Sequence, residues 1–341
     1  MLKENIHSKL FPGKAYNDSN FRVLVHNLNE LAKKFCAYGV FESNKTDYKF
    51  KEFLGLMKKE QFQYLDKMVS GMLIDLDSAD LNADQYYYNK FRLEYENLFF
   101  LSVSHASVFE KLLHKANFEK TFDDLTSFYF IITLRLYINI LNLQIIYKKE
   151  FKTDHFERML LLIDKETLKE NPYTDIYFCV INMLRGNQQN KYFIKTKEKL
   201  KILKNSLHPD DLNEIYINLT NYCNRCIVSG KKEFIKEKFD IYKEESESKA
   251  YLLNGFVTPV YYKNRIRLGL DLKEFVWVRE FIENFKDKLH PDSKNNVYLY
   301  NLALYEFEVN NFNYSLELLS KISLDELYMK FDVKVLQIMI Y

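Results

Sequence analysis

Glycine and proline are scarce in this chain, whose 341 residues include 8 glycines and 5 prolines. Average usage of about 12% would give roughly 41 of the two together. β-Sandwiches, β-barrels and Gly-rich nucleotide-binding folds use these residues in their turns and phosphate loops, so the deficit argues against all three classes. The apolar fraction of 47% is nevertheless ample for a packed core at this length.

An excess of charge of one sign is lacking as well. The formal net charge of +2 predicts no general attraction to nucleic acid or to an anionic membrane. Four cysteines are too few for a disulfide framework, and no apolar run of signal-peptide length follows Met1. We therefore expect a cytoplasmic protein. The cysteines are Cys36, Cys179, Cys223 and Cys226.

One apolar stretch, Phe128 to Tyr147, is long enough to cross a bilayer, but it contains Arg135, Asn139 and Asn142. We expect a buried central helix and no membrane insertion. The three polar residues are spaced i, i+4, i+7 and form one stripe. Because a buried guanidinium needs a partner, Arg135 predicts either an internal carboxylate or a groove floor that contacts a partner peptide.

Helical spacing dominates the rest of the chain, so the predicted fold class is all-α. Asn17 and Asp18 can cap a helix whose apolar face contains Phe21, Leu24, Leu28, Leu31 and Phe35. Further helices are predicted at 47–57, 59–77, 83–114, 122–149, 154–164, 172–186, 190–206, 211–228, 233–248, 259–271 and 274–288, with another opening at Asp325.

A short internal repeat divides the second half of the chain. Leu-His-Pro-Asp at 207–210 recurs at 289–292, and we interpret each copy as a turn at which one helix stops and the next starts. His208 and His290 are thus predicted to act in turns rather than as ligands. The interval has room for two helical hairpins of roughly 41 residues each.

Residues 298–322, YLYNLALYEFEVNNFNYSLELLSKI, resemble a tetratricopeptide hairpin. Leu302 and Ala303 match its first helix, and Phe312, Ser315 and Leu319 match its second, so all five are predicted to be buried between the two helices. Asn310-Asn311 replaces the preferred Gly-Asp of the turn.

More broadly, Leu10–Lys14 with Tyr16–Asp18, and the stretch 269–278, resemble an uncharacterised bacterial family of tetratricopeptide-like proteins. The resemblance implies a right-handed superhelical solenoid of antiparallel helix pairs over 206–341, after a less regular helical region at 1–205. The apolar pattern still runs at Ile340-Tyr341, so we expect the natural protein to continue beyond residue 341.

The resemblance also implies a binding surface. Members that grip the terminal carboxylate of a peptide use Lys, Arg and Asn side chains on first helices, which correspond here to Lys263, Asn264, Arg267 and Asn301. The leading hypothesis is therefore a protein-interaction scaffold that binds a peptide or partner protein on its concave face. An alternative is the sensing or regulatory arm of a longer protein with an effector beyond residue 341.

A second alternative is a nucleic-acid-binding adaptor that uses the lysine-rich segment 191–204. No pattern in the sequence predicts an enzyme, a cofactor or a metal site. Cys223 and Cys226 have C-x-x-C spacing but no second pair, so we interpret them as two cysteines inside a helix. The lysines of the segment are Lys191, Lys195, Lys197, Lys199, Lys201 and Lys204.

Overall fold

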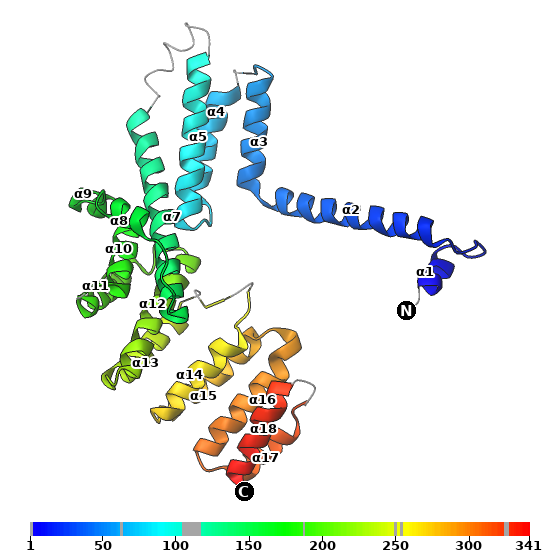
Figure 1. Cartoon of the computed structure of the whole chain (residues 1–341), viewed down its shortest axis with the longest axis vertical. Helices are drawn as coiled ribbons and strands as arrows, with labels where there is room; N and C mark the ends of the chain where they lie inside the picture. The colour runs from blue at the N-terminus through cyan, green and yellow to red at the C-terminus, as the bar shows by residue number, and fades with distance from the viewer. Residues whose placement is uncertain are drawn as a thin grey trace. The chain divides into compact units, whose positions relative to one another are not determined.

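A computed structural model describes residues 3–61, 64–103, 117–186, 188–248, 251–252, 255–323 and 327–341 (Figure 1). These ranges hold 17 α-helices and one short 3-10 helix. Their one extended pairing is an isolated parallel bridge between Val257 and Leu289, in which Val257 N donates to Lys288 O. The all-α prediction is confirmed. Residues 104–114 of one predicted helix, and Asp325, lie outside the described ranges.

The chain forms two compact units. The first unit comprises residues 1–79 and 88–124, and the second comprises residues 80–87 and 125–341. The second unit therefore reaches well before residue 206, where the regular region was predicted to begin.

The first unit is built from consecutive helices with polar caps. Asn17 caps α2 by accepting a hydrogen bond from Asn20 N, as predicted, and Asn44 caps α3 in the same way through Asp47 N. Arg92 of α5 pairs with Asp47 at 2.9 Å and covers the ring of Phe50, which ties α5 to α3. The helices are α1 (Lys3–Leu10), α2 (Asp18–Ser43), α3 (Lys45–Lys58), α4 (Leu65–Ser78), most of α5 (Ala83–Val103) and the start of α7 (Phe118–Tyr147).

The second unit packs helices mainly against those that follow them in sequence. Contacts concentrate in the pairs α10–α11, α12–α13, α14–α15 and α16–α17, and α14 also contacts α16, which contacts α18. The helices are α8 (Asp154–Leu160), α9 (Lys165–Glu170), α10 (Pro172–Leu184), α11 (Gln189–Leu203), α12 (Pro209–Val228), α13 (Glu233–Ser246), α14 (Pro259–Asp271), α15 (Phe275–Phe285), the 3-10 helix η3 (Lys286–Lys288), α16 (Pro291–Glu308), α17 (Phe312–Ser320) and α18 (Leu327–Ile340).

Two hydrophobic cores lie in this unit. One joins buried side chains of α7, α8 and α10 to α13, including Ile131, Tyr177 and Leu219. The other joins α14 to α18, including Tyr262 and Leu319. The helix pairs of residues 172–246 and 259–320 thus serve two separate cores.

The repeated Leu-His-Pro-Asp sequence starts a helix at each copy. His208 and His290 are N-caps whose Nδ1 accepts a hydrogen bond from Asp210 N and Asp292 N, at 3.1 and 3.3 Å. Proline follows at the first helical position, where a backbone N–H would have no hydrogen-bond partner within the helix, so its absence costs nothing. The predicted turn role of both histidines is confirmed.

Three helix pairs share one kind of turn. Gly230, Lys273 and Asn310 each have a positive φ, of 92°, 59° and 63°. In each turn the next residue's N–H donates to a carbonyl five residues back, for example Asn311 N to Glu306 O at 2.8 Å. This left-handed helix ending closes the pairs α12–α13, α14–α15 and α16–α17.

The predicted core of the last pair is largely confirmed. Leu302, Ala303, Ser315 and Leu319 are buried, and Ser315 Oγ donates to Ala303 O at 2.8 Å. Phe312 was predicted to be buried as well, and this was wrong, since the side chain is 40% exposed. It is the first residue of α17 and its ring contacts Phe307, so it lies at the end of the helix pair rather than between the helices.

Helix α7 is buried on one side only. Ile131, Leu134 and Ile138 are buried, whereas Leu136 and Ile146 are exposed, so the expected burial of this helix holds for one side of it and not for the other. Among the described helices, α7 alone is long and apolar enough to cross a membrane, a test that core helices also pass.

Candidate functional site

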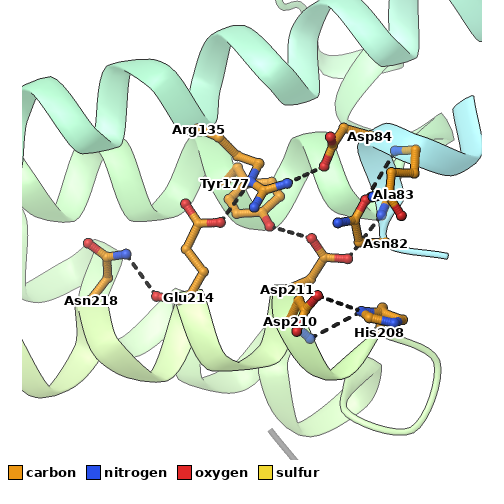
Figure 2. Close-up of polar contacts among 11 residues, drawn as sticks. Asn82, Ala83, Asp84, Arg135, Tyr177, His208, Asp210, Asp211, Glu214 and Asn218 are labelled. Carbon is orange, nitrogen blue, oxygen red and sulfur yellow. Dashed lines mark hydrogen bonds and ion pairs between the residues drawn. The ribbon is translucent and has the colours of Figure 1, made fainter. Parts of the chain in front are cut away.

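The polar stripe of α7 meets a polar stripe of α12 (Figure 2). Arg135 Nε donates to Glu214 Oε2 at 2.7 Å, and Arg135 Nη1 donates to the carboxylate of Asp84. Burial by itself disfavours the guanidinium cation, but the attraction of Glu214 and Asp84 outweighs it and raises the pKa of Arg135. Arg135 therefore has the internal carboxylates that its position demands, the first of the two predicted alternatives.

A third carboxylate, that of Asp211, completes this cluster. Asp211 is fully buried and accepts hydrogen bonds from Tyr177 OH at 2.8 Å and from Ala83 N at 3.0 Å. Burial raises the pKa of Asp211, and the hydrogen bond from Tyr177 opposes that rise. Asp211 thereby fixes the start of α5 to α10 and α12 (Figure 2). Its contacts hold helices together.

Farther along the same stripe, Asn142 Nδ2 donates to Asn218 Oδ1 at 2.9 Å, and Asn218 Nδ2 donates to Glu214 O at 2.8 Å. Asn139 is exposed. Beyond them on α12, Arg225 Nη2 is buried without a hydrogen-bond partner, and burial lowers the pKa of Arg225.

The stripe on α7 was predicted from the sequence, but its counterpart on α12 was missed. Asp211, Glu214 and Asn218 have the spacing i, i+3, i+7, which places them on one face of a helix. That spacing was a usable signal, because polar residues on the side of an amphipathic helix that carries Ile215 and Leu219 need partners.

The C-terminal candidates lie on α14 and α16. Lys263 Nζ is 2.5 Å from Asp332 Oδ2 of α18 and 5.4 Å from the ring centroid of Tyr300 on α16. Asn264 and Arg267 are exposed. Burial raises the pKa of Tyr300. The negative charge of Asp332 raises this pKa further, and the positive charge of Arg267 lowers it. Lys263 and Arg267 thus border the same surface, where α14, α16 and α18 meet.

Asn301 differs from these three residues. Its side chain is 2% exposed, Nδ2 donates to Val297 O at 2.7 Å, and Oδ1 has no hydrogen-bond partner. The prediction treated Asn301 as a groove residue, and the structure instead places it in the core. Leu302 and Ala303, which follow it on α16, are buried as well, because this helix is covered on more than one side.

The lysine-rich segment forms α11 and is partly neutralised within the chain. Lys197 pairs with Glu237 and Lys199 pairs with Asp175. The remaining four lysines, Lys191, Lys195, Lys201 and Lys204, are exposed. A shallow hollow between α11 and α13 is lined by carboxylates as well as lysines, so it is not a uniformly basic site.

The C-x-x-C cysteines lie inside α12 and are both buried. Burial raises the pKa of the Cys223 thiol to about 12, which disfavours the thiolate that metal binding or disulfide exchange requires. Within the described ranges, no group of three or more His, Cys, Asp or Glu side chains is arranged to hold a metal ion.

Comparison of the chain with protein-family models, curated proteins and solved structures gives no match. The tetratricopeptide-like resemblance therefore rests on the residues that carry it.

Proposed function

We propose that this protein is an interaction scaffold of the tetratricopeptide-like, superhelical kind, which binds a peptide or partner protein across α14, α16 and α18. The observation that carries the proposal is the contact of α14 with α16 and of α16 with α18. Helices α14 and α16 are the first helices of successive pairs, and α18 extends the row; in helical-repeat proteins such a row lines an extended binding surface.

The chemistry of this row favours an acidic or carboxylate-bearing ligand. Arg267 is exposed, and its planar guanidinium can donate two parallel hydrogen bonds to one carboxylate. Asn264 is exposed beside it and can both donate and accept along a peptide backbone. Lys263 is held by Asp332, so a bound carboxylate would compete with that aspartate for the ammonium group.

The test is a library of peptides presented to the full-length chain in two forms, with free C-terminal carboxylates and with C-terminal amides. We expect binders in the carboxylate form. Arg267→Glu should abolish their binding, whereas Asp332→Asn, which releases Lys263, should tighten it. Lys232→Glu is the matched control, since it makes the same charge change at the exposed N-cap of α13.

Binding that ignores Arg267→Glu, or that does not distinguish acids from amides, would contradict this assignment. The nucleic-acid alternative makes a separate prediction. It requires a salt-dependent affinity for RNA or DNA that falls when Lys191, Lys195 and Lys201 are changed to Ala.

A further inference from the structure

Helix α2 exposes an apolar face along most of its length. Phe21 is its one buried residue, and the rings of His7 and Tyr16 cover it. Five apolar side chains on the same face remain exposed within the first unit; we call them the α2 seam. They are Leu24 (39% exposed), Leu28 (63%), Leu31 (62%), Phe35 (77%) and Tyr38 (61%).

The spacing of the α2 seam is that of a helix that packs along another helix. From Phe21 onward the residues follow one another at intervals of three, four, three, four and three. This is the a/d repeat of a coiled coil, a narrow apolar stripe that a single partner helix can cover. Val25 and Ala32 widen the stripe on one side, and no charged residue interrupts it between Phe21 and Tyr38.

The charges of α2 do not call for a partner of opposite sign. The helix carries three acidic and three basic residues, so two copies would not repel one another through net charge. Arg22 pairs with Asp18 and Lys33 pairs with Glu30, each at 2.7 Å within the helix. The six charged residues are Asp18, Arg22, Glu30, Lys33, Lys34 and Glu42.

The area available also matches what a modest dimer requires. The five seam residues and Val25 each expose roughly 100 Å² of apolar side chain, or about 600 Å² for one copy. Two copies would bury about 1,200 Å², the lower end of stable, specific interfaces. A self-complementary stripe with no net charge on its helix fits a second copy of the same helix.

We infer that the α2 seam is a self-association surface, on which α2 of a second copy of this chain packs antiparallel. In a parallel pair the repeat would place Glu42 opposite Glu42 of the partner subunit and Phe35 opposite Phe35 of the partner subunit. In an antiparallel pair centred between Leu28 and Leu31, Phe35 lies opposite a leucine, Leu24 of the partner subunit. The two Glu42 side chains then stand apart, and the ring of Phe35 meets a smaller side chain.

The first experiment measures the oligomeric state of the full chain by sedimentation equilibrium. We expect a dimer, and we expect Leu28→Glu with Leu31→Glu to raise its dissociation constant about 100-fold or more, because both charges would enter an apolar seam. His26→Glu with Asn29→Glu is the matched control, since it adds the same charge to other faces of α2 and should leave the dimer intact. Circular dichroism should be unchanged in both variants.

A wild-type chain that stays monomeric up to about 100 μM, the range where weak specific dimers form, would overturn the inference. So would a dimer that survives the Leu28 and Leu31 substitutions, because its interface would then lie elsewhere. Either result would assign the α2 seam to another occupant, a different protein or another part of this chain.

The second experiment tests orientation by disulfide trapping in a Cys36→Ser background, in which the other three cysteines are buried. One preparation carries Asn27→Cys and another carries Lys34→Cys, at positions that flank the seam. The antiparallel arrangement predicts that mixing them gives mainly the 27–34 disulfide by mass spectrometry. A dominant 27–27 disulfide would show a parallel pair and overturn the inferred orientation.

Discussion

Helices α2 and α16 have similar apolar spacing and opposite surroundings. On α16, Leu302 and Ala303 are buried by α14, α17 and α18, while on α2, Leu28 and Leu31 are exposed within their unit. The turn after α16 packs α17 along it, whereas α3 leaves the end of α2 at a steep angle and contacts little of it (Figure 1). Periodicity therefore shows that a helix has a face to bury, and the next element decides whether the same chain buries it.

Two buried charges, one in each unit, offer a second contrast. In the helix pairs, Glu245 of α13 and Arg265 of α14 are both buried and pair with each other. In the first unit, Asp124 is buried and its Oδ2 accepts no hydrogen bond. The following predictions test both contrasts.

The largest effect is expected at the buried ion pair. Glu245→Ala would leave the Arg265 guanidinium buried without a carboxylate, which should lower the free energy of unfolding by about 3–5 kcal/mol in urea denaturation. Lys321→Ala, which breaks an exposed pair with Glu317 within α17 and its C-cap, should cost far less. Equal losses in the two variants would show that burial of the pair is not what matters.

A matched leucine substitution separates the two kinds of helix face. Leu219→Ala removes a fully buried side chain from the core of the second unit and should cost about 2–5 kcal/mol. Leu28→Ala should change the unfolding of the monomer by less than about 0.5 kcal/mol. Chemical denaturation at low protein concentration checks both, and a large loss at Leu28 there would mean that its own chain covers the α2 seam.

Asp124 should make the first unit less stable as the pH rises. Burial raises the pKa of Asp124 to about 6; Lys90 and Lys120 act against the rise, and Glu94 and Asp123 add to it. Between about pH 4 and pH 6 the folded chain holds a proton that the unfolded chain has released, so stability falls across that window.

Asp124→Asn should therefore stabilise the protein by about 2–3 kcal/mol at pH 7.5 and by much less at pH 4. Thermal unfolding followed at both pH values measures the difference. A gain that does not depend on pH would mean that the carboxylate is solvated and that its burial does not control the titration.

The smallest effects concern the shared turn of the helix pairs. Lys273→Gly removes a left-handed backbone strain, offset in part by the greater entropy of glycine in the unfolded chain, and should stabilise by about 0.5 kcal/mol. Asn310→Gly should gain less, since asparagine tolerates this conformation. Gly230→Ala should destabilise, and the opposite signs at Gly230 and Lys273 are the result to check.

Local chemistry made much of this fold predictable. The cap at Asn17, the helix starts at Pro209 and Pro291, and the apolar faces of α12 to α17 each depend on residues within one or two turns of one another. Such features can be inferred from spacing alone. The scarcity of glycine and proline pointed to the same fold class.

Contacts between segments that are far apart in the chain could not be predicted from the sequence. Arg135 was known to need a carboxylate, but the choice of Glu214 and Asp84 depends on how three helices converge. Asn301 and Phe312 were assigned to the wrong surroundings because a helix position faces core or solvent according to its neighbours, which a motif match does not specify. The exposure of the α2 seam was hidden for the same reason.

The pair formed by Glu245 and Arg265 also constrains how this protein can change over generations. Losing either partner alone strands a buried charge, while replacing both with apolar side chains of similar volume is close to neutral. A single substitution at either Glu245 or Arg265 is therefore strongly destabilising. We expect descendants of this sequence to inherit the two residues together or to lack both, which would make positions 245 and 265 a covarying pair wherever α13 meets α14.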